Sequence, residues 1–165
     1  MSDSHDNLTG IDLAIKTFRT EPPVDLVIHC GDFCSPFALR SLQRLEIPLK
    51  AVTGNNDGDL FMIRNIFDAQ KDWELKQHLF EIDLGGQRAA ILHGDIPRLG
   101  ELLLRSNGYD WIFLGHNHQT GIEQKAKTTL INPGETCGWL TGRGTVAKVD
   151  TDRKSAQIIE LFVRD

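Results

Sequence analysis

Most of the histidines of this chain lie in short polar clusters with Asp, Asn or Gly. Five such clusters run along it: Asp3-Ser4-His5, His29-Cys30-Gly31-Asp32, Gly54-Asn55-Asn56-Asp57, His93-Gly94 and Gly115-His116-Asn117-His118. One cluster alone would be an ordinary Gly-rich loop, but five in order favour a shared site. Mixed Asp, Asn and His ligands suit Mn, Fe, Zn, Ni or Co, whereas an all-oxygen set would suit Mg or Ca. So many ligands suggest two ions rather than one.

The segments that must position these clusters alternate between helices and strands. Apolar spacing and turn residues predict helices over Leu8–Arg19, after Ser35-Pro36, around Leu60–Phe67 and from Leu99 to Asn107-Gly108. Strands are expected at Val24–Ile28, Pro48–Val52 and Trp111–Leu114, with a hairpin at Gly85-Gly86 between Phe80–Leu84 and Arg88–Leu92. From Thr128 the pattern is β only: Thr129–Ile131, Thr145–Val149 and Ile158–Val163. This predicts one α/β domain over residues 1–165, in which four of the clusters follow strands and meet at their carboxyl ends.

Composition limits the class of partner. The 165 residues include 18 Lys and Arg against 23 Asp and Glu, a formal charge of -5. No basic stripe for nucleic acid, no membrane span and no signal sequence is evident, so a cytoplasmic protein is expected. Cys30, Cys34 and Cys137 are too few and too scattered for a disulfide framework; small buried thiols are a simpler interpretation of Cys30 and Cys34 than a metal clip.

Two of the histidines need separate interpretations. His78 stands alone and is read as a structural or surface residue. His29 precedes Asp32 by three residues, so it is either simply buried or, as we favour, a support for the neighbouring ligands.

The five clusters, in this order, resemble the motifs of the calcineurin-like metallophosphoesterase superfamily. Ile131-Asn132-Pro133-Gly134 after the last motif is most similar to its compact bacterial and archaeal phosphodiesterase branch. The resemblance covers nearly the whole chain. It implies a four-layer αββα sandwich, in which two mixed β-sheets pack face to face between helices.

The resemblance also implies a dinuclear metal centre. One ion would be held by Asp3, His5, Asp32 and His118, and the other by Asp32, Asn55, His93 and His116, with Asp32 bridging the two. Two divalent ions are implied, most simply Mn, with Ni, Fe, Zn or Co as alternatives. A hydroxide between them would attack the phosphorus of a small phosphoester. Because the ions outweigh the carboxylates, the site would attract an anionic substrate although the chain is acidic. Asp32, His116 and Asn56 are the expected catalytic residues.

One departure from the family lies at Asn56, where many relatives carry His. A neutral amide cannot act as a general acid, which typically contributes ~10²–10⁴-fold. Asn56 can still donate a hydrogen bond to a phosphate oxygen, so a preference for activated or diester substrates is expected. The neighbouring Asp57 is expected to anchor the loop rather than bind metal.

A second departure lies at the start of the chain. Relatives have a central apolar strand before Asp-x-His, whereas only Met1 and Ser2 precede Asp3. The first strand is therefore expected to be missing, and the natural chain to begin upstream.

Alternative functions within the same fold are a non-catalytic interaction scaffold, like the retromer subunit, and a phosphomonoesterase. The intact set Asp32, Asn55, His93, His116 and His118 disfavours a scaffold. Relatives that form dimers or tetramers suggest a homodimer or homotetramer.

Overall fold

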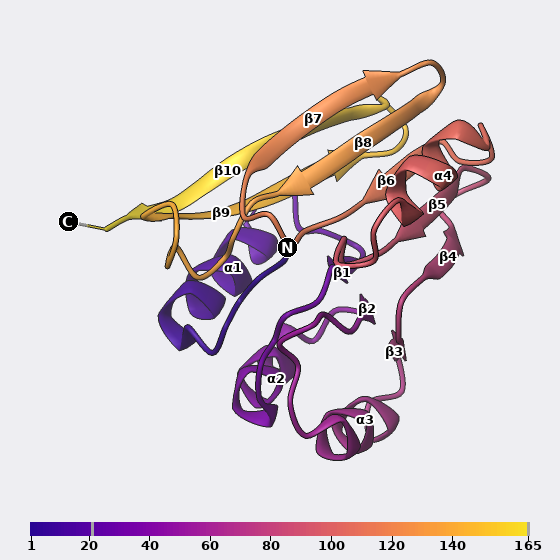
Figure 1. Cartoon of the computed structure of the whole chain (residues 1–165). Coiled ribbons are helices and arrows are strands. Elements are labelled where there is room, and N and C mark those ends of the chain that lie inside the picture. The colour runs from indigo at the N-terminus through magenta and orange to yellow at the C-terminus, as the bar shows by residue number, and fades with distance from the viewer. Residues whose placement is uncertain (21, 165) are drawn as a thin grey trace.

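The computed structural model, which describes residues 1–20 and 22–164, layers sheets between helices (Figure 1). The first half alternates helices and short parallel strands: α1 (Leu8–Arg19), β1 (Val27–His29), α2 (Pro36–Leu42), the 3-10 turn η1 (Gln43–Leu45), β2 (Leu49–Val52), α3 (Leu60–Asp68) and β3 (Trp73–Lys76). The second half is mostly β: β4 (Phe80–Asp83), β5 (Arg88–Ile91), α4 (Leu99–Arg105), β6 (Trp111–Phe113), β7 (Thr120–Lys125), β8 (Thr128–Pro133), β9 (Arg143–Asp150) and β10 (Ser155–Val163).

The strands of the described residues pair into three sheets. Strands β1, β2 and β3 form a parallel sheet in that order. The larger sheet has the order β4-β5-β6-β8-β7 and is parallel in its middle and antiparallel at both ends. Strands β9 and β10 form a long antiparallel ribbon with a bulge between Glu160 and Phe162.

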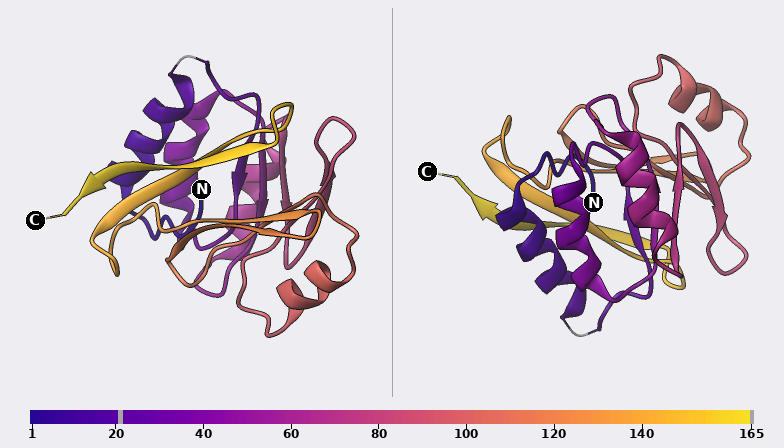
Figure 2. Two further views of the ribbon diagram at one scale, coloured as in Figure 1. Left: turned by 90° about the horizontal axis from the view of Figure 1, so that it is seen from above. Right: turned by 90° about the horizontal axis from the view of Figure 1, so that it is seen from below.

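Three groups of buried side chains define the layers. Helices α1, α2 and α3 pack on one face of the β1–β3 sheet, with Ile11, Leu39 and Phe67 in their shared core. A second core, including Ile91 and Trp111, lies between the two larger sheets. Helix α4 covers the opposite face of the larger sheet, over residues such as Ala90 and Ile112. Neighbouring residues of β5 thus serve different cores, because successive side chains of a strand point to opposite faces. The predicted α/β sandwich with outer helices is confirmed, and Figure 2 shows α1 to α3 and α4 on opposite sides.

Residues 1–3 lie between the β1–β3 sheet and the segment that leads to β9. The amino group of Met1 donates to Ile28 O at 2.8 Å, and Cys30 N donates to Met1 O at 3.0 Å. On the other side, Thr136 N donates to Ser2 O at 2.9 Å. These bonds reach only the end of β1, and β9 and β10 pair as a separate sheet. The expectation of a further strand upstream stays a prediction.

The sequence located the apolar elements well and missed two polar ones. Helix α1 has the predicted bounds, with the Asn7 side chain accepting from Gly10 N at its start. The hairpin at Gly85-Gly86 and helices α2 to α4 are also confirmed, whereas β1 begins at Val27 rather than Val24. Strands β3 and β7 were not predicted. Both are edge strands with largely solvent-facing side chains, so they lack the apolar run that marks a strand. No helix among the described residues is both long and apolar enough to cross a membrane.

Candidate metal centre

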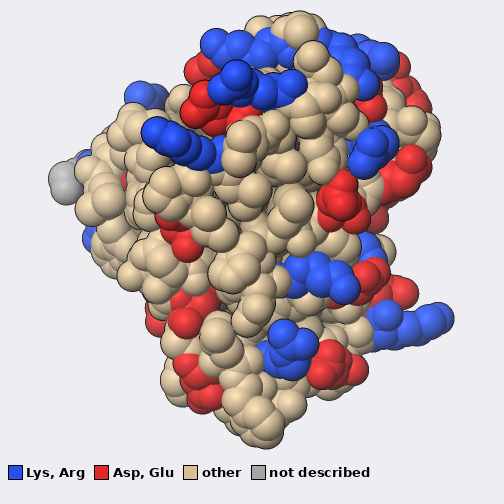
Figure 3. Space-filling model, turned by 45° about the vertical axis from the view of Figure 1, so that its right-hand side comes forward, with Lys and Arg blue, Asp and Glu red and all other residues tan. Residues whose placement is uncertain are grey.

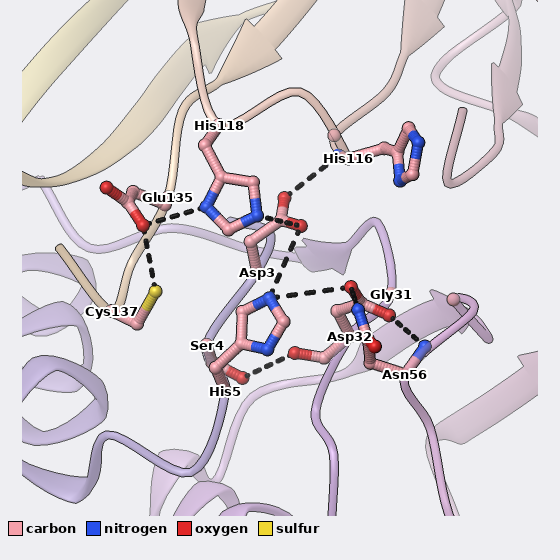
Figure 4. Close-up of polar contacts among 12 residues, drawn as sticks. Asp3, Ser4, His5, Gly31, Asp32, Asn56, His116, His118, Glu135 and Cys137 are labelled. Carbon is pink, nitrogen blue, oxygen red and sulfur yellow. Dashed lines mark hydrogen bonds and ion pairs between the residues drawn. The ribbon is translucent and has the colours of Figure 1, made fainter. Parts of the chain in front are cut away.

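Polar clusters that are far apart in the sequence meet at the carboxyl ends of the strands (Figure 4). Asp32 follows β1, Asn55 and Asn56 follow β2, His93 follows β5, and His116 and His118 follow β6. Residues 3–5 reach the same place, because Asp3 N donates to Gly31 O and His5 N donates to Asp32 O. The convergence expected from the strand pattern is therefore present.

The first group of side chains is formed by Asp3, His5 and His118. Asp3 Oδ1 lies 3.9 Å from His5 Nε2 and 3.5 Å from His118 Nε2, and the two imidazole rings stack with centroids 5.2 Å apart. Asp3 is fully buried, and burial raises the pKa of its carboxyl group. Within the described part of the chain, neither Asp3 Oδ1 nor His5 Nε2 has a hydrogen-bond partner, although both atoms are buried. Such orphaned polar atoms are costly, and a coordinated cation would satisfy them.

Asp32 stands between the first group and a second one. Its Oδ2 lies 3.4 Å from His5 Nε2 and 3.4 Å from His93 Nε2. Burial alone would raise the pKa of Asp32, but the adjacent His93 ring and the hydrogen bonds from Asn56 hold it well below its usual range. An ionised carboxylate between two imidazole nitrogens is suited to bridge two cations.

The second group consists of Asp32, His93 and Asn55. His93 Nδ1 lies 2.7 Å from Cys30 O, and because a carbonyl only accepts, this nitrogen carries the proton. His93 Nε2 then faces the site, 3.0 Å from Asn55 Oδ1. Burial favours the neutral ring, but the adjacent Asp32 outweighs this and raises the pKa of His93. Asp3, Asp32 and His93 also bring ligand atoms close enough together to hold one ion.

His116 occupies a different position from the other predicted ligands. Its backbone N–H donates to Asp3 Oδ2 at 3.1 Å, while its exposed ring stands edge-on to His93, with centroids 5.0 Å apart. The structure therefore brings six of the predicted ligands into two adjoining groups, and the ring of His116 lies at the rim of these groups. The six are Asp3, His5, Asp32, Asn55, His93 and His118. The assignment of each to a metal ion stays a prediction.

Two glycines leave room for this arrangement. Gly31 has φ +96°, and a Cβ there would lie 2.9 Å from His93 Nδ1 and 2.7 Å from Gly54 N. A Cβ on Gly54 would lie 2.2 Å from Asp32 Oδ1. Side chains at either position would therefore displace Asp32 or His93.

The residues after β2 hold Asp32 and its loop. Asn56 donates twice to Asp32, from its backbone N to Oδ1 and from Nδ2 to Oδ2, both at 2.8 Å. Asp57 accepts from Cys34 N at 2.8 Å and from Gly54 N at 2.7 Å. The prediction that Asp57 anchors the loop is confirmed.

Cys30 and Cys34 have different surroundings. Cys30 is buried, as the sequence suggested, whereas Cys34 is only partly buried. Cys34 Sγ lies 3.0 Å from His5 Nδ1.

The favoured role of His29 as a support agrees with its contacts. Gly31 N donates to His29 Nδ1 at 3.2 Å, so the ring proton is on Nε2, which lies 3.0 Å from Ser4 Oγ. This bond ties the buried ring to the turn between Asp3 and His5.

Two residues, one in the last part of β8 and one just after it, support the site and were not predicted to do so. Asn132 Nδ2 donates to Gly115 O and to Asn117 Oδ1, which holds the loop that carries His116 and His118. Glu135 Oε2 lies 2.8 Å from His118 Nδ1. Burial alone would raise the pKa of Glu135, but hydrogen bonds from His118 and Thr141 lower it to about 2. The sequence offers only a weak signal for them, the polar stretch Asn132-Pro133-Gly134-Glu135 at the end of a strand.

Comparison with known proteins agrees with the geometry. Residues 1–154 match the model of the calcineurin-like phosphoesterase superfamily domain. The chain belongs to this superfamily. Membership confirms the resemblance seen in the motifs and the prediction of a phosphoester hydrolase.

Several members of the superfamily are similar over nearly their whole length. The phosphodiesterase MJ0936 of Methanocaldococcus jannaschii is 34% identical over 161 residues, which cover 98% of this chain and 96% of that protein. A probable metallophosphoesterase of Methanothermobacter thermautotrophicus is 30% identical over 166 residues, which cover 96% and 89%.

Solved structures show the same fold. The structure of a novel archaeal phosphodiesterase superposes with a TM-score of 0.91 at 34% identity, covering 97% of this chain and 96% of that one. The phosphoesterase Yfce of E. coli (TM-score 0.67, 17% identity, 98% and 97% covered) and Vps29 of Entamoeba histolytica (0.63, 13%, 92% and 89%) share the fold alone.

Proposed function

We propose that this member of the superfamily hydrolyses phosphodiesters with the help of two divalent metal ions, Mn²⁺ being the first to test. The observation that carries the proposal is the pair of buried atoms Asp3 Oδ1 and His5 Nε2, which lack hydrogen-bond partners in the described residues. They lie beside a carboxylate oxygen of Asp32 that is equally close to His5 and His93. A single ion held by Asp3, Asp32 and His93 would leave the other predicted ligands unused.

The residues suggest how the ions would be shared. Asp3, His5 and His118 would hold one ion, His93 and Asn55 the other, and Asp32 would bridge them. His116 would join the second ion after a rotation of its exposed side chain, because its ring already lies against His93. When bound, two divalent ions activate a water as the nucleophile and neutralise the charge that develops on the phosphoryl group.

Asn56 would orient both the carboxylate of Asp32 and the substrate. An amide nitrogen carries two hydrogens, so one can hold Asp32 Oδ2 while the other donates to a phosphate oxygen. Asn56 cannot protonate the leaving oxygen, which makes the reaction depend on leaving groups that depart as stable anions. This favours activated diesters over esters of simple alcohols.

The charges on the face shown in Figure 3 agree with a small anionic substrate rather than a nucleic-acid duplex. Acidic and basic side chains are interspersed over the face shown in Figure 3. Ion pairs such as Arg88–Glu81 and Lys125–Glu123 place opposite charges next to each other. Duplex binding would instead need a continuous basic surface.

The test is Mn²⁺-dependent hydrolysis of bis-p-nitrophenyl phosphate by the wild type and Asp32→Asn. Loss of the charged bridge should reduce kcat by at least ~100-fold, comparable to the loss of a key electrostatic group in other enzymes. Asp152→Asn, an exposed carboxylate in the turn before β10, is the matched control and should retain the wild-type rate. Equal rates for Asp32→Asn and the wild type would contradict the proposal. A faster reaction with p-nitrophenyl phosphate than with the diester would indicate a phosphomonoesterase instead.

A further inference from the structure

Glu135 holds His118 from the side that faces away from the proposed ions. Both residues are buried, Glu135 completely, and their contact joins the loop after β8 to the loop after β6. His118 Nδ1 lies 2.8 Å from Glu135 Oε2, and Nε2 lies 3.5 Å from Asp3 Oδ1 on the opposite side of the ring. The imidazole is thus placed between two carboxylates, of which only Asp3 belongs to the predicted ligands (Figure 4).

The other neighbours of Glu135 are all hydrogen-bond donors. Oε2 accepts from Cys137 Sγ and Trp139 N, both at 3.0 Å, and Oε1 accepts from the hydroxyl group of Thr141 at 2.7 Å. The backbone N–H groups of Leu140 and Thr141 complete the set. A carboxylate surrounded in this way is ionised and has no proton to give. The hydrogen of the contact with His118 must therefore belong to Nδ1.

The position of this proton determines what the other ring nitrogen can do. A neutral imidazole with its proton on Nδ1 presents a lone pair on Nε2. In His118 that lone pair points toward Asp3 Oδ1. His93 is arranged in the same sense, but its Nδ1 donates to a backbone carbonyl, which no substitution can remove.

The same side chains allow a rival interpretation. His118, Glu135 and Cys137 place ligand atoms close enough together to hold an ion of their own. However, both oxygens of Glu135 already accept several hydrogen bonds, and Cys137 uses its S–H group as one of the donors. The cluster is therefore a filled hydrogen-bond network, in contrast to the orphaned atoms of Asp3 and His5.

We propose that Glu135 is a positioning residue that fixes the Nδ1–H tautomer and the orientation of His118, so that Nε2 is presented to the ion held with Asp3 and His5. The inference rests on the proposed function, which supplies the metal ion that Nε2 would bind. The tautomer itself is a property of the metal-free protein. Carboxylates behind metal-binding histidines typically contribute 10–100-fold to metal affinity.

The experiment compares the wild type with Glu135→Gln and Thr141→Val. Thr141→Val is the matched control, because it removes a hydrogen bond to Oε1 of the same carboxylate and keeps the contact of Oε2 with His118. Long-range ¹H–¹⁵N NMR spectra of the metal-free proteins, recorded at a pH where the ring is neutral, report the His118 tautomer. Calorimetric titration with Mn²⁺ reports the affinity of each site.

Wild type and Thr141→Val should show His118 as a single Nδ1–H tautomer. Glu135→Gln should show a mixture, and the affinity of one Mn²⁺ site should fall roughly 10–100-fold while the other changes less than twofold. The proposal is overturned if Glu135→Gln keeps the wild-type tautomer and both affinities. It is equally overturned if wild-type His118 carries its proton on Nε2, a result that holds even where the variant does not fold. A wild type with the expected tautomer but no phosphodiesterase activity would refute the proposed function alone.

Discussion

Asn56 donates a hydrogen bond to each carboxylate oxygen of Asp32, from its backbone N–H to Oδ1 and from its side-chain amide to Oδ2, both at 2.8 Å. These two bonds fix the rotation of the carboxylate that lies between His5 and His93. The residue that departs from the family pattern therefore has a structural role in holding Asp32, whatever it contributes to the leaving group.

Asn56→Ala tests the hydrogen bond that the side chain donates to Asp32 Oδ2. A hydrogen bond to a charged group is worth ~1.5–3 kcal/mol, and the backbone bond remains, so we expect kcat with bis-p-nitrophenyl phosphate to fall about tenfold. Asn65→Ala, an exposed position on α3, should leave the rate unchanged. An unaltered rate in Asn56→Ala would show that the side chain neither orients Asp32 nor contacts the substrate.

Gly54→Ala tests whether Asp32 needs the space beside it. The added Cβ would lie 2.2 Å from Asp32 Oδ1 and 2.6 Å from Asp32 N, a contact that forces the carboxylate to move. We expect Mn²⁺ affinity, measured by calorimetry, to fall at least ~10-fold, as for other disturbances of groups that orient metal ligands. Gly121→Ala is the control, because a Cβ there meets no heavy atom within 4 Å. Equal affinities in the two variants would argue against Asp32 as a ligand.

Metal addition should stabilise the fold. The buried carboxylates of Asp3 and Asp32 lie near each other around His5, and cations would neutralise them in the folded state only. At an ion concentration 100 times the Kd, one site adds ~2.7 kcal/mol, which corresponds to roughly 5–10 °C in Tm for a chain of this size. Thermal melts of chelator-treated protein with and without Mn²⁺ measure the shift, and Asp32→Asn should show a smaller one. A Tm indifferent to Mn²⁺, Zn²⁺ and Ni²⁺ would count against the metal centre.

The fold could be predicted where local pattern and burial agree. Helix α1 has its predicted bounds because Ile11, Ile15 and Phe18 form one buried face and Asn7 caps its start. Strand β7 was not predicted, because its side chains face solvent and show no apolar pattern. Its conformation depends on pairing with β8. Pairing across a sheet edge leaves no trace in the composition of a polar segment.

The candidate site was predictable to the extent that its residues share one type of position. Asp32, Asn55 and His93 each follow a strand, so their convergence could be derived before any coordinates. Glu135 was missed because its role is defined by a partner, His118, and not by a motif of its own. The outward placement of the His116 ring depends on a side-chain rotation that sequence spacing does not determine.

Metal affinity should fall as the pH decreases from about 8 to 6. The ligands must lose their protons to bind, and Asp32 raises the pKa of His93 above the usual histidine value of 6.5. Competition by protons therefore begins above that value, with a loss of up to about tenfold in affinity per pH unit for each proton displaced. Mn²⁺ titrations across this range measure the slope. The exposed His78→Gln variant should have the wild-type slope, and an affinity independent of pH would contradict the assignment of His93.

His29 should make the metal-free protein less stable in acid. Burial keeps the pKa of this ring well below the usual histidine value of 6.5, so the ring stays neutral in the folded state as the pH falls. In the unfolded chain the same ring binds a proton below about 6.5, and the unfolded state then holds more protons. The free energy of unfolding contributed by His29 is therefore fully present above that pH. Below it, this contribution decreases, with a slope approaching ~1.4 kcal/mol per pH unit.

Urea unfolding of chelator-treated protein between about pH 5 and pH 8 measures this slope. His29→Gln keeps a donor near Ser4 Oγ, in the place of Nε2, and removes the titrating ring. Its free energy of unfolding should depend less steeply on pH than that of the wild type. The slopes should differ by up to ~1.4 kcal/mol per pH unit, the value for one proton. His78→Gln removes an exposed histidine and should follow the wild-type curve. If His29→Gln and His78→Gln have the same pH dependence, His29 is protonated in the folded protein, and its role as a neutral donor to Ser4 is wrong.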